Sequence, residues 1–72
     1  MITLEYDNKY EVVLIVDKEG AEDLQKMLLT FINDMESHYH LMTPAFGGDQ
    51  LSDSLLNKNN SIVNMLRIQY IK

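Results

Sequence analysis

The sequence predicts an α+β fold whose elements follow the order β-β-α-β-β. Three observations lead to this prediction. Short apolar stretches with strand-like alternation lie near both ends of the chain, one apolar stripe with helical spacing lies between them, and the composition is globular, with 46% hydrophobic and 24% charged residues. The 72 residues allow a single domain, residues 1–72. Because a one-sided helix needs a sheet to cover, we expect a four-stranded, mainly antiparallel sheet with the helix packed on one face.

The first two strands form a predicted hairpin. In residues 1–6, apolar side chains alternate with polar ones at Thr3 and Glu5, which is typical of a half-buried strand. Residues 7–9 are polar and include Asp and Asn, which favour turns. Residues 10–16 are rich in β-branched side chains and apolar on both faces, which predicts a second, more deeply buried strand.

A helix is expected to follow directly. Asp17 is placed to cap a helix that begins at Lys18 and ends near residue 35 or 36. Its apolar residues are spaced three and four apart, at Ala21, Leu24, Leu28, Phe31 and Met35. This spacing predicts one buried face, with Leu28 packed in the core against Leu14, Leu66 and Ile68. Leu29 lies off this stripe and is a candidate contact for a partner chain.

The second half of the chain contains two more predicted strands and a long connection. Residues 38–43 alternate as a third strand, which Pro44 ends because its ring fixes the backbone. Residues 62–71 form the predicted last strand. The intervening residues 44–60 make a long loop for so small a domain, and loops of this length are often functional. We place one helical turn within this loop, near residues 51–56.

Composition excludes several classes of partner. The chain has 11 acidic and 6 basic residues, a net charge of −5. The basic residues are scattered, whereas phosphate binding needs them clustered, so we expect no nucleic-acid partner. The longest apolar run, residues 12–16, is far shorter than the roughly 20 residues of a membrane span, and acidic residues near the start argue against a signal peptide. We therefore expect a cytoplasmic protein with no membrane partner.

No residue pattern predicts catalysis or a bound cofactor. His38 and His40 share one side of the predicted third strand and are suitable zinc or copper ligands, but the sequence does not place a third ligand. The chain has no cysteine, and its serines lack a nucleophile motif. Gly47 and Gly48 indicate a tight turn and not a phosphate loop, because Asp and Gln follow where Lys and Ser or Thr are needed. We expect no enzyme activity, no metal and no cofactor.

One segment of the chain is distinctive. Residues 40–52 read His-Leu-Met-Thr-Pro-Ala-Phe-Gly-Gly-Asp-Gln-Leu-Ser. With the preceding hairpin and helix and the closing strand, this segment resembles the immunity protein 32 family of bacterial polymorphic toxin systems. That family usually carries Trp where this chain has Phe46, a change that keeps an aromatic side chain but loses the indole donor. The resemblance implies a small intracellular protein that binds and neutralises a cognate toxin, often a nuclease.

The long loop is the predicted contact surface for such a toxin. We expect Phe46, Asp49, Gln50 and Asp53 to form part of it, because aromatic side chains anchor interfaces and charges steer association. The other interpretation is that the loop only covers the open sheet face, with Phe46 and Leu51 turned inward. A different function also fits the sequence: a small homodimeric regulatory or ligand-binding protein that uses the free sheet face as its interface.

Overall fold

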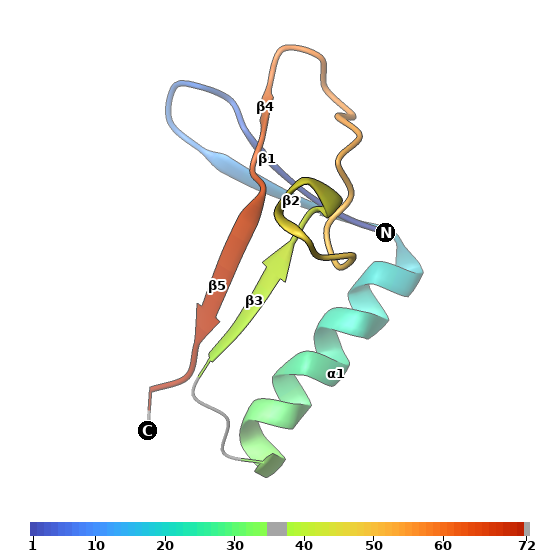
Figure 1. The fold of residues 1–72 in the computed structure, drawn as a ribbon, viewed down its shortest axis with the longest axis vertical. Helices are drawn as coiled ribbons and strands as arrows, with labels where there is room; N and C mark the ends of the chain where they lie inside the picture. The colour runs from blue at the N-terminus through green and yellow to red at the C-terminus, as the bar shows by residue number, and fades with distance from the viewer. Residues whose placement is uncertain (35–37, 72) are drawn as a thin grey trace.

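The computed structural model describes residues 1–34 and 38–71, which form one helix and two antiparallel sheets (Figure 1). The elements are β1 (Ile2–Tyr6), β2 (Val12–Val16), α1 (Lys18–Asp34), β3 (His38–Met42), the 3-10 turn η1 (Pro44–Phe46), β4 (Ser61–Ile62) and β5 (Met65–Gln69). One sheet has the order β2-β1-β4, and the other pairs β3 with β5. The predicted α+β class with antiparallel strands is confirmed. The prediction of one four-stranded sheet is wrong.

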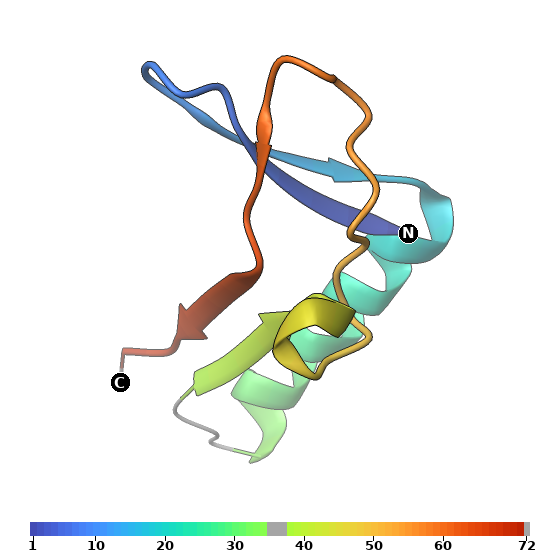
Figure 2. The ribbon, with the colours of Figure 1, turned by 45° about the horizontal axis from the view of Figure 1, so that its top comes forward.

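The predicted last strand is divided between the two sheets, which is why no single sheet forms. The Val63 N–H donates to the Leu4 carbonyl of β1 at 2.9 Å, whereas the carbonyl of the next residue, Asn64, accepts the Thr43 N–H at 3.0 Å. The hydroxyl of Thr43, a fully buried residue, also donates to the Asn64 Oδ1 at 2.7 Å. Figure 2 shows the β4–β5 segment running from the hairpin to β3. Neighbouring residues thus pair with different strands.

The hairpin turn is confirmed, but β2 begins at Val12 and not at Tyr10. Asn8 has a left-handed backbone, with φ of 67°. The Asp7 Oδ1 accepts the backbone N–H groups of residues 9–11 at 2.8, 2.9 and 3.1 Å. These amides are bound by a carboxylate and not by β1, so Tyr10 stays in the turn and is 94% exposed.

Helix α1 begins at Lys18 as predicted, because Asp17 caps it. The Asp17 Oδ1 accepts the Gly20 N–H at 2.8 Å and also contacts the Met1 ammonium at 2.6 Å. Gly20 is buried, and a Cβ at this position would lie 2.1 Å from the Met1 carbonyl oxygen. A glycine in the first turn is therefore required by close backbone approach, despite its low helix propensity.

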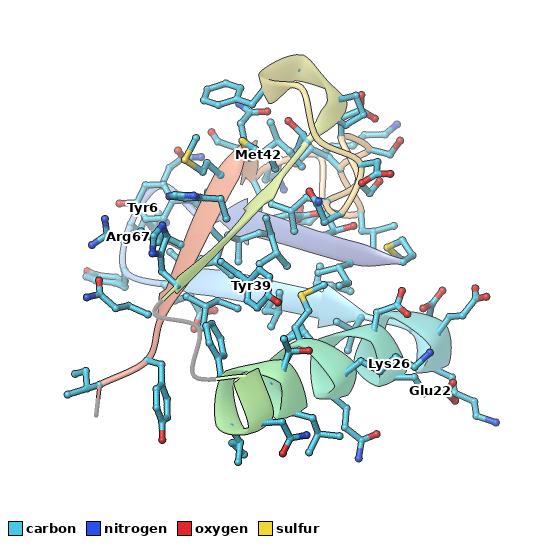
Figure 3. The ribbon with its side chains drawn as sticks, turned by 60° about the horizontal axis from the view of Figure 1, so that its bottom comes forward. Tyr6, Glu22, Lys26, Tyr39, Met42 and Arg67 are labelled. Carbon is cyan, nitrogen blue, oxygen red and sulfur yellow. The ribbon has the colours of Figure 1, made fainter. Side chains whose placement is uncertain are left out.

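The core lies where β1, β3 and the 44–60 segment meet, and α1 closes it from one side. Its buried hydrophobic residues are Ile2, Leu4, Phe31, Leu41 and Leu51. Four of these residues, Ile2, Leu4, Leu41 and Leu51, form one cluster, and Leu24 and Met27 of α1 and Leu66 and Ile68 of β5 pack against it. Phe31 meets the ring of Tyr39 edge-on, with centroids 5.0 Å apart. In Figure 3, Tyr39 lies between the strands and α1, whereas Arg67 lies on the other side of the strands.

The predicted burial of Leu28 is wrong. Leu28 is 47% exposed, and Leu14, which was expected to pack against it, is 44% exposed. The apolar arc of α1 is wider than the surface that the sheets cover, and the side centred on Leu24, Met27 and Phe31 takes the buried position. Met35, the last residue of the predicted stripe, lies outside the described residues. Among residues 1–34 and 38–71, no helix is long and apolar enough to cross a membrane.

Candidate functional site

Residues 44–51 fold back against the end of β3, and main-chain hydrogen bonds hold them there. The N–H groups of Phe46 and Gly48 both donate to the Thr43 carbonyl, at 2.9 and 3.0 Å. The Leu51 N–H donates to the Met42 carbonyl at 3.2 Å, and the Leu51 side chain is 2% exposed. The segment is therefore built on β3 through its backbone and anchored in the core by Leu51. The predicted helical turn near 51–56 is wrong, since the turn of helix lies at Pro44–Phe46.

The two glycines of this segment serve different purposes. Gly47 has φ of 87°, a left-handed backbone that ends the 3-10 turn and that glycine adopts without strain. Gly48 has an ordinary φ, but a Cβ there would lie 2.6 Å from the Met42 carbonyl oxygen. The predicted tight turn is confirmed, and it sets the direction in which the preceding residue, Phe46, leaves the backbone.

All four residues predicted to contact a partner are exposed, but Gln50 is also bound to β3. Phe46 is 53% exposed, and Asp49 and Asp53 are exposed as well. Gln50 is exposed too, but its Oε1 accepts the Met42 N–H at 3.2 Å and so helps to fix the segment. The other interpretation had both Phe46 and Leu51 turned inward. Leu51 is buried, but Phe46 is not. We call Phe46, Asp49 and Asp53 the Phe46 surface.

A buried carboxylate anchors the far end of the long connection. Glu5 of β1 is fully buried, and it accepts the Leu56 N–H at 2.8 Å, the Asn60 Nδ2 at 3.0 Å and the Asn57 N–H at 3.4 Å. The Leu56 N–H, followed by the Asn60 amide, lowers the pKa of Glu5 below its ordinary value of 4.5. Sequence reasoning missed this role because the strand alternation places Glu5 on the polar face, and its partners lie more than 50 residues away.

A second surface lies at the other end of the fold, between β2 and α1. An apolar groove of about 380 Å³ runs between the two elements. Its main lining residues are Leu14, Val16, Leu24, Leu28, Leu29 and Ile32. We call this surface the β2–α1 groove. No charged side chain lines it, and Gln25 is its one polar residue among the described part of the chain. Leu29, which lies off the predicted stripe and was a candidate contact for a partner chain, belongs to this groove.

The two histidines share one face of β3, as predicted. Their ring centroids are 5.0 Å apart, and His40 lies opposite Arg67 in the register with β5. A metal ion bound there would meet the Arg67 cation, which disfavours it electrostatically. Within residues 1–34 and 38–71, no three His, Asp or Glu side chains gather where they could hold one metal ion.

Comparison of this chain with family models, with curated proteins and with solved structures gives no match.

Proposed function

We propose that this chain is a non-enzymatic binding protein that neutralises a cognate bacterial toxin, and that the Phe46 surface contacts that toxin. The observation that carries the proposal is an aromatic side chain, 53% exposed, on a segment that its own backbone hydrogen bonds fix. Just over half of Phe46 is left in solvent in the isolated chain, and aromatic side chains commonly anchor protein interfaces.

The fixed backbone also favours binding. Ordering a flexible loop at an interface costs free energy, and a segment that is already ordered avoids this cost. Residues 44–51 are tied to β3 at Met42 and Thr43, and Glu5 holds the end of the connection at residues 56–60. The backbone at Phe46 is therefore held in place before any partner arrives.

The charge of the chain favours a basic partner. The net charge is −5, and Asp49 and Asp53 place two carboxylates near Phe46 in the sequence. A nuclease carries a basic surface for its phosphate substrate, and an acidic surface attracts it and accelerates association. A nuclease toxin is thus the class of partner that the chemistry fits best.

The resemblance to immunity protein 32 supports the same segment. The residues that carry it, 40–52, include Thr43, Gly47, Gly48 and Leu51, which build and anchor the Phe46 surface. The residues that carry the resemblance are thus also the residues that set the backbone shape of the proposed contact.

The experiment that tests the function is neutralisation of a toxin encoded beside this chain's gene. We expect co-expression of the chain to restore growth of cells that produce the toxin domain. Stoichiometric chain should also abolish the toxin's activity in a purified assay. Toxin activity that is unchanged at a tenfold excess of folded chain would contradict the proposal.

A further inference from the structure

Within residues 1–34 and 38–71, no strand pairs with the outer edge of β2, and the hydrogen bonds of the hairpin show which backbone groups point toward that edge. The Asp7 N–H donates to the Glu11 carbonyl and the Asp17 N–H to the Met1 carbonyl. In an antiparallel ladder, hydrogen-bonded pairs alternate with non-bonded pairs. The backbone N–H and C=O groups of the odd-numbered residues of β2 therefore point toward β1. The N–H and C=O groups of Val12, Leu14 and Val16 therefore point away from β1, at the edge of the sheet.

The other edge of β1 confirms this alternation. The carbonyls of Ile2 and Leu4 accept the N–H groups of Ser52 and Val63, at 2.7 and 2.9 Å. The backbone N–H and C=O groups of the even-numbered residues of β1 thus point away from β2. Those of the odd-numbered residues point toward it. The assignment of the outward-facing residues of β2 follows from both sides of the sheet.

The outward-facing residues of β2 are also apolar and exposed. Val12 is 58%, Leu14 44% and Val16 39% exposed. Protein sheets usually protect such an edge with Lys, Pro or a bulge, and β2 has none of these. The β2–α1 groove adjoins this edge, where Leu28, Leu29 and Ile32 are 47 to 62% exposed. Edge and groove form one apolar surface.

The exposed surface area of the chain is also larger than the average for a monomer of its mass. The exposed area is 5181 Å² for 8.4 kDa, whereas monomers of this mass expose about 4600 Å². The radius of gyration is 12.7 Å, against about 11 Å for a compact domain of this length. The excess of about 600 Å² approaches the roughly 800 Å² that each partner buries in a standard interface.

We propose that β2 and the β2–α1 groove form a homodimer interface, in which β2 pairs with β2 of a second copy. The edge itself selects this occupant, because the outward N–H and C=O groups of β2 in one copy can pair with the same groups of a second, antiparallel copy. Val12–Val16 and the groove carry no carboxylate, so two chains of −5 each bring no like charges together at the centre of this contact. At the ends of β2, where Glu11 and Asp17 lie, the Met1 ammonium offsets the charge of Asp17. This inference is independent of the proposed function.

Symmetry fixes the register of the pair. A two-fold axis perpendicular to the sheet at Leu14 places Leu14 opposite its own copy and Val12 opposite Val16. All three residues then use their outward N–H and C=O groups, and the two three-stranded sheets become one six-stranded sheet. Such an axis keeps both copies of α1 on the same face, so the two grooves meet there.

The register is tested with introduced cysteines, because the chain has none of its own. Hydrogen-bonded antiparallel pairs have Cα atoms about 5.5 Å apart, which lies within the range for a disulfide. We expect Leu14→Cys to form a covalent dimer under mild oxidation. Val12→Cys, four residues off register with itself, should not cross-link, whereas Val12→Cys mixed with Val16→Cys should.

The association itself is tested by light scattering and by dilution. We expect the wild-type chain to have twice the monomer mass, and Leu29→Glu to weaken the dimer at least ~tenfold by burying a charge. Leu56→Glu is the matched control, since Leu56 is 57% exposed outside the groove. A wild-type monomer at all concentrations, open-ended aggregation, or equal cross-linking of Leu14→Cys and Val12→Cys would overturn the proposal.

Discussion

Glu5 and Leu56 are 51 residues apart in the sequence, and a 2.8 Å hydrogen bond joins the buried carboxylate of the first to the backbone N–H of the second. This contact links the central strand of one sheet to the segment that leads into β4. The alternating pattern of β1 placed Glu5 on the polar face of a half-buried strand, without a partner for it. The structure instead uses the polar face of β1 to hold the end of the long connection.

The first prediction concerns pH. Hydrogen bonds lower the folded-state pKa of Glu5 below its ordinary value of 4.5. Ionised Glu5 therefore stabilises the fold above about that pH, and this stabilisation is lost as the pH falls through the lowered value. We expect Glu5→Gln to lower the melting temperature at pH 7, because an amide cannot accept as many N–H groups.

The pH dependence of the difference in melting temperature between wild type and Glu5→Gln shows whether the charge of Glu5 is responsible. The gap in melting temperature between wild type and Glu5→Gln should be largest near pH 7 and should shrink below pH 4.5. Glu11→Gln, at an exposed glutamate of the hairpin, serves as the control. A gap that is the same at pH 7 and pH 3 would show that the charge of Glu5 does not hold the 56–60 segment.

A second prediction concerns Gly20. Replacing a glycine within a helix by alanine usually stabilises the helix by about 1 kcal/mol. Here the new Cβ would lie 2.1 Å from the Met1 carbonyl oxygen, so the backbone contact between α1 and the start of β1 must open. We expect Gly20→Ala to destabilise the protein in urea unfolding. A gain in stability would mean that this contact is absent in solution.

A third prediction separates the core from the groove with two leucines. Leu41 is 1% exposed and Leu28 is 47% exposed. Leu41→Ala should cost about 2–5 kcal/mol of unfolding free energy. Leu28→Ala should cost less than about 1 kcal/mol, measured at a concentration where the protein is monomeric. Equal losses would restore Leu28 to the core, as its helical spacing alone predicted.

The local features of the fold were predictable because local chemistry determines them. Asp17 caps α1, Asn8 adopts the left-handed turn, and Pro44 ends β3, each through residues within a few positions. The prediction that Leu66 and Ile68 belong to the core is also confirmed, because both pack against the buried cluster.

The long-range features were not predictable from one sequence. The bend at Val63 and Asn64 depends on two partners, Leu4 and Thr43, that the sequence does not bring together. The apolar stripe of α1 predicted burial of Leu28 because periodicity shows which side is apolar, but not how much of that side the sheets can cover. The same excess of apolar surface forms the β2–α1 groove.

For the candidate site, sequence reasoning identified the segment but not its construction. The loop length and the aromatic beside acidic residues indicated residues 44–60. That Leu51 is buried while Phe46 is exposed depends on the fold of the segment against β3. The hydrogen bond from the Met42 N–H to the Gln50 side chain depends on the same packing.

The most direct test of the account measures the affinity of the purified toxin domain for wild-type chain and for Phe46→Ala. We predict that Phe46→Ala keeps the wild-type melting temperature and weakens binding at least ~tenfold. Tyr10→Ala, which removes a 94% exposed aromatic far from this surface in the sequence, should bind as wild type does. Phe46→Ala with unchanged affinity, or with affinity reduced no more than that of Tyr10→Ala, would contradict the account.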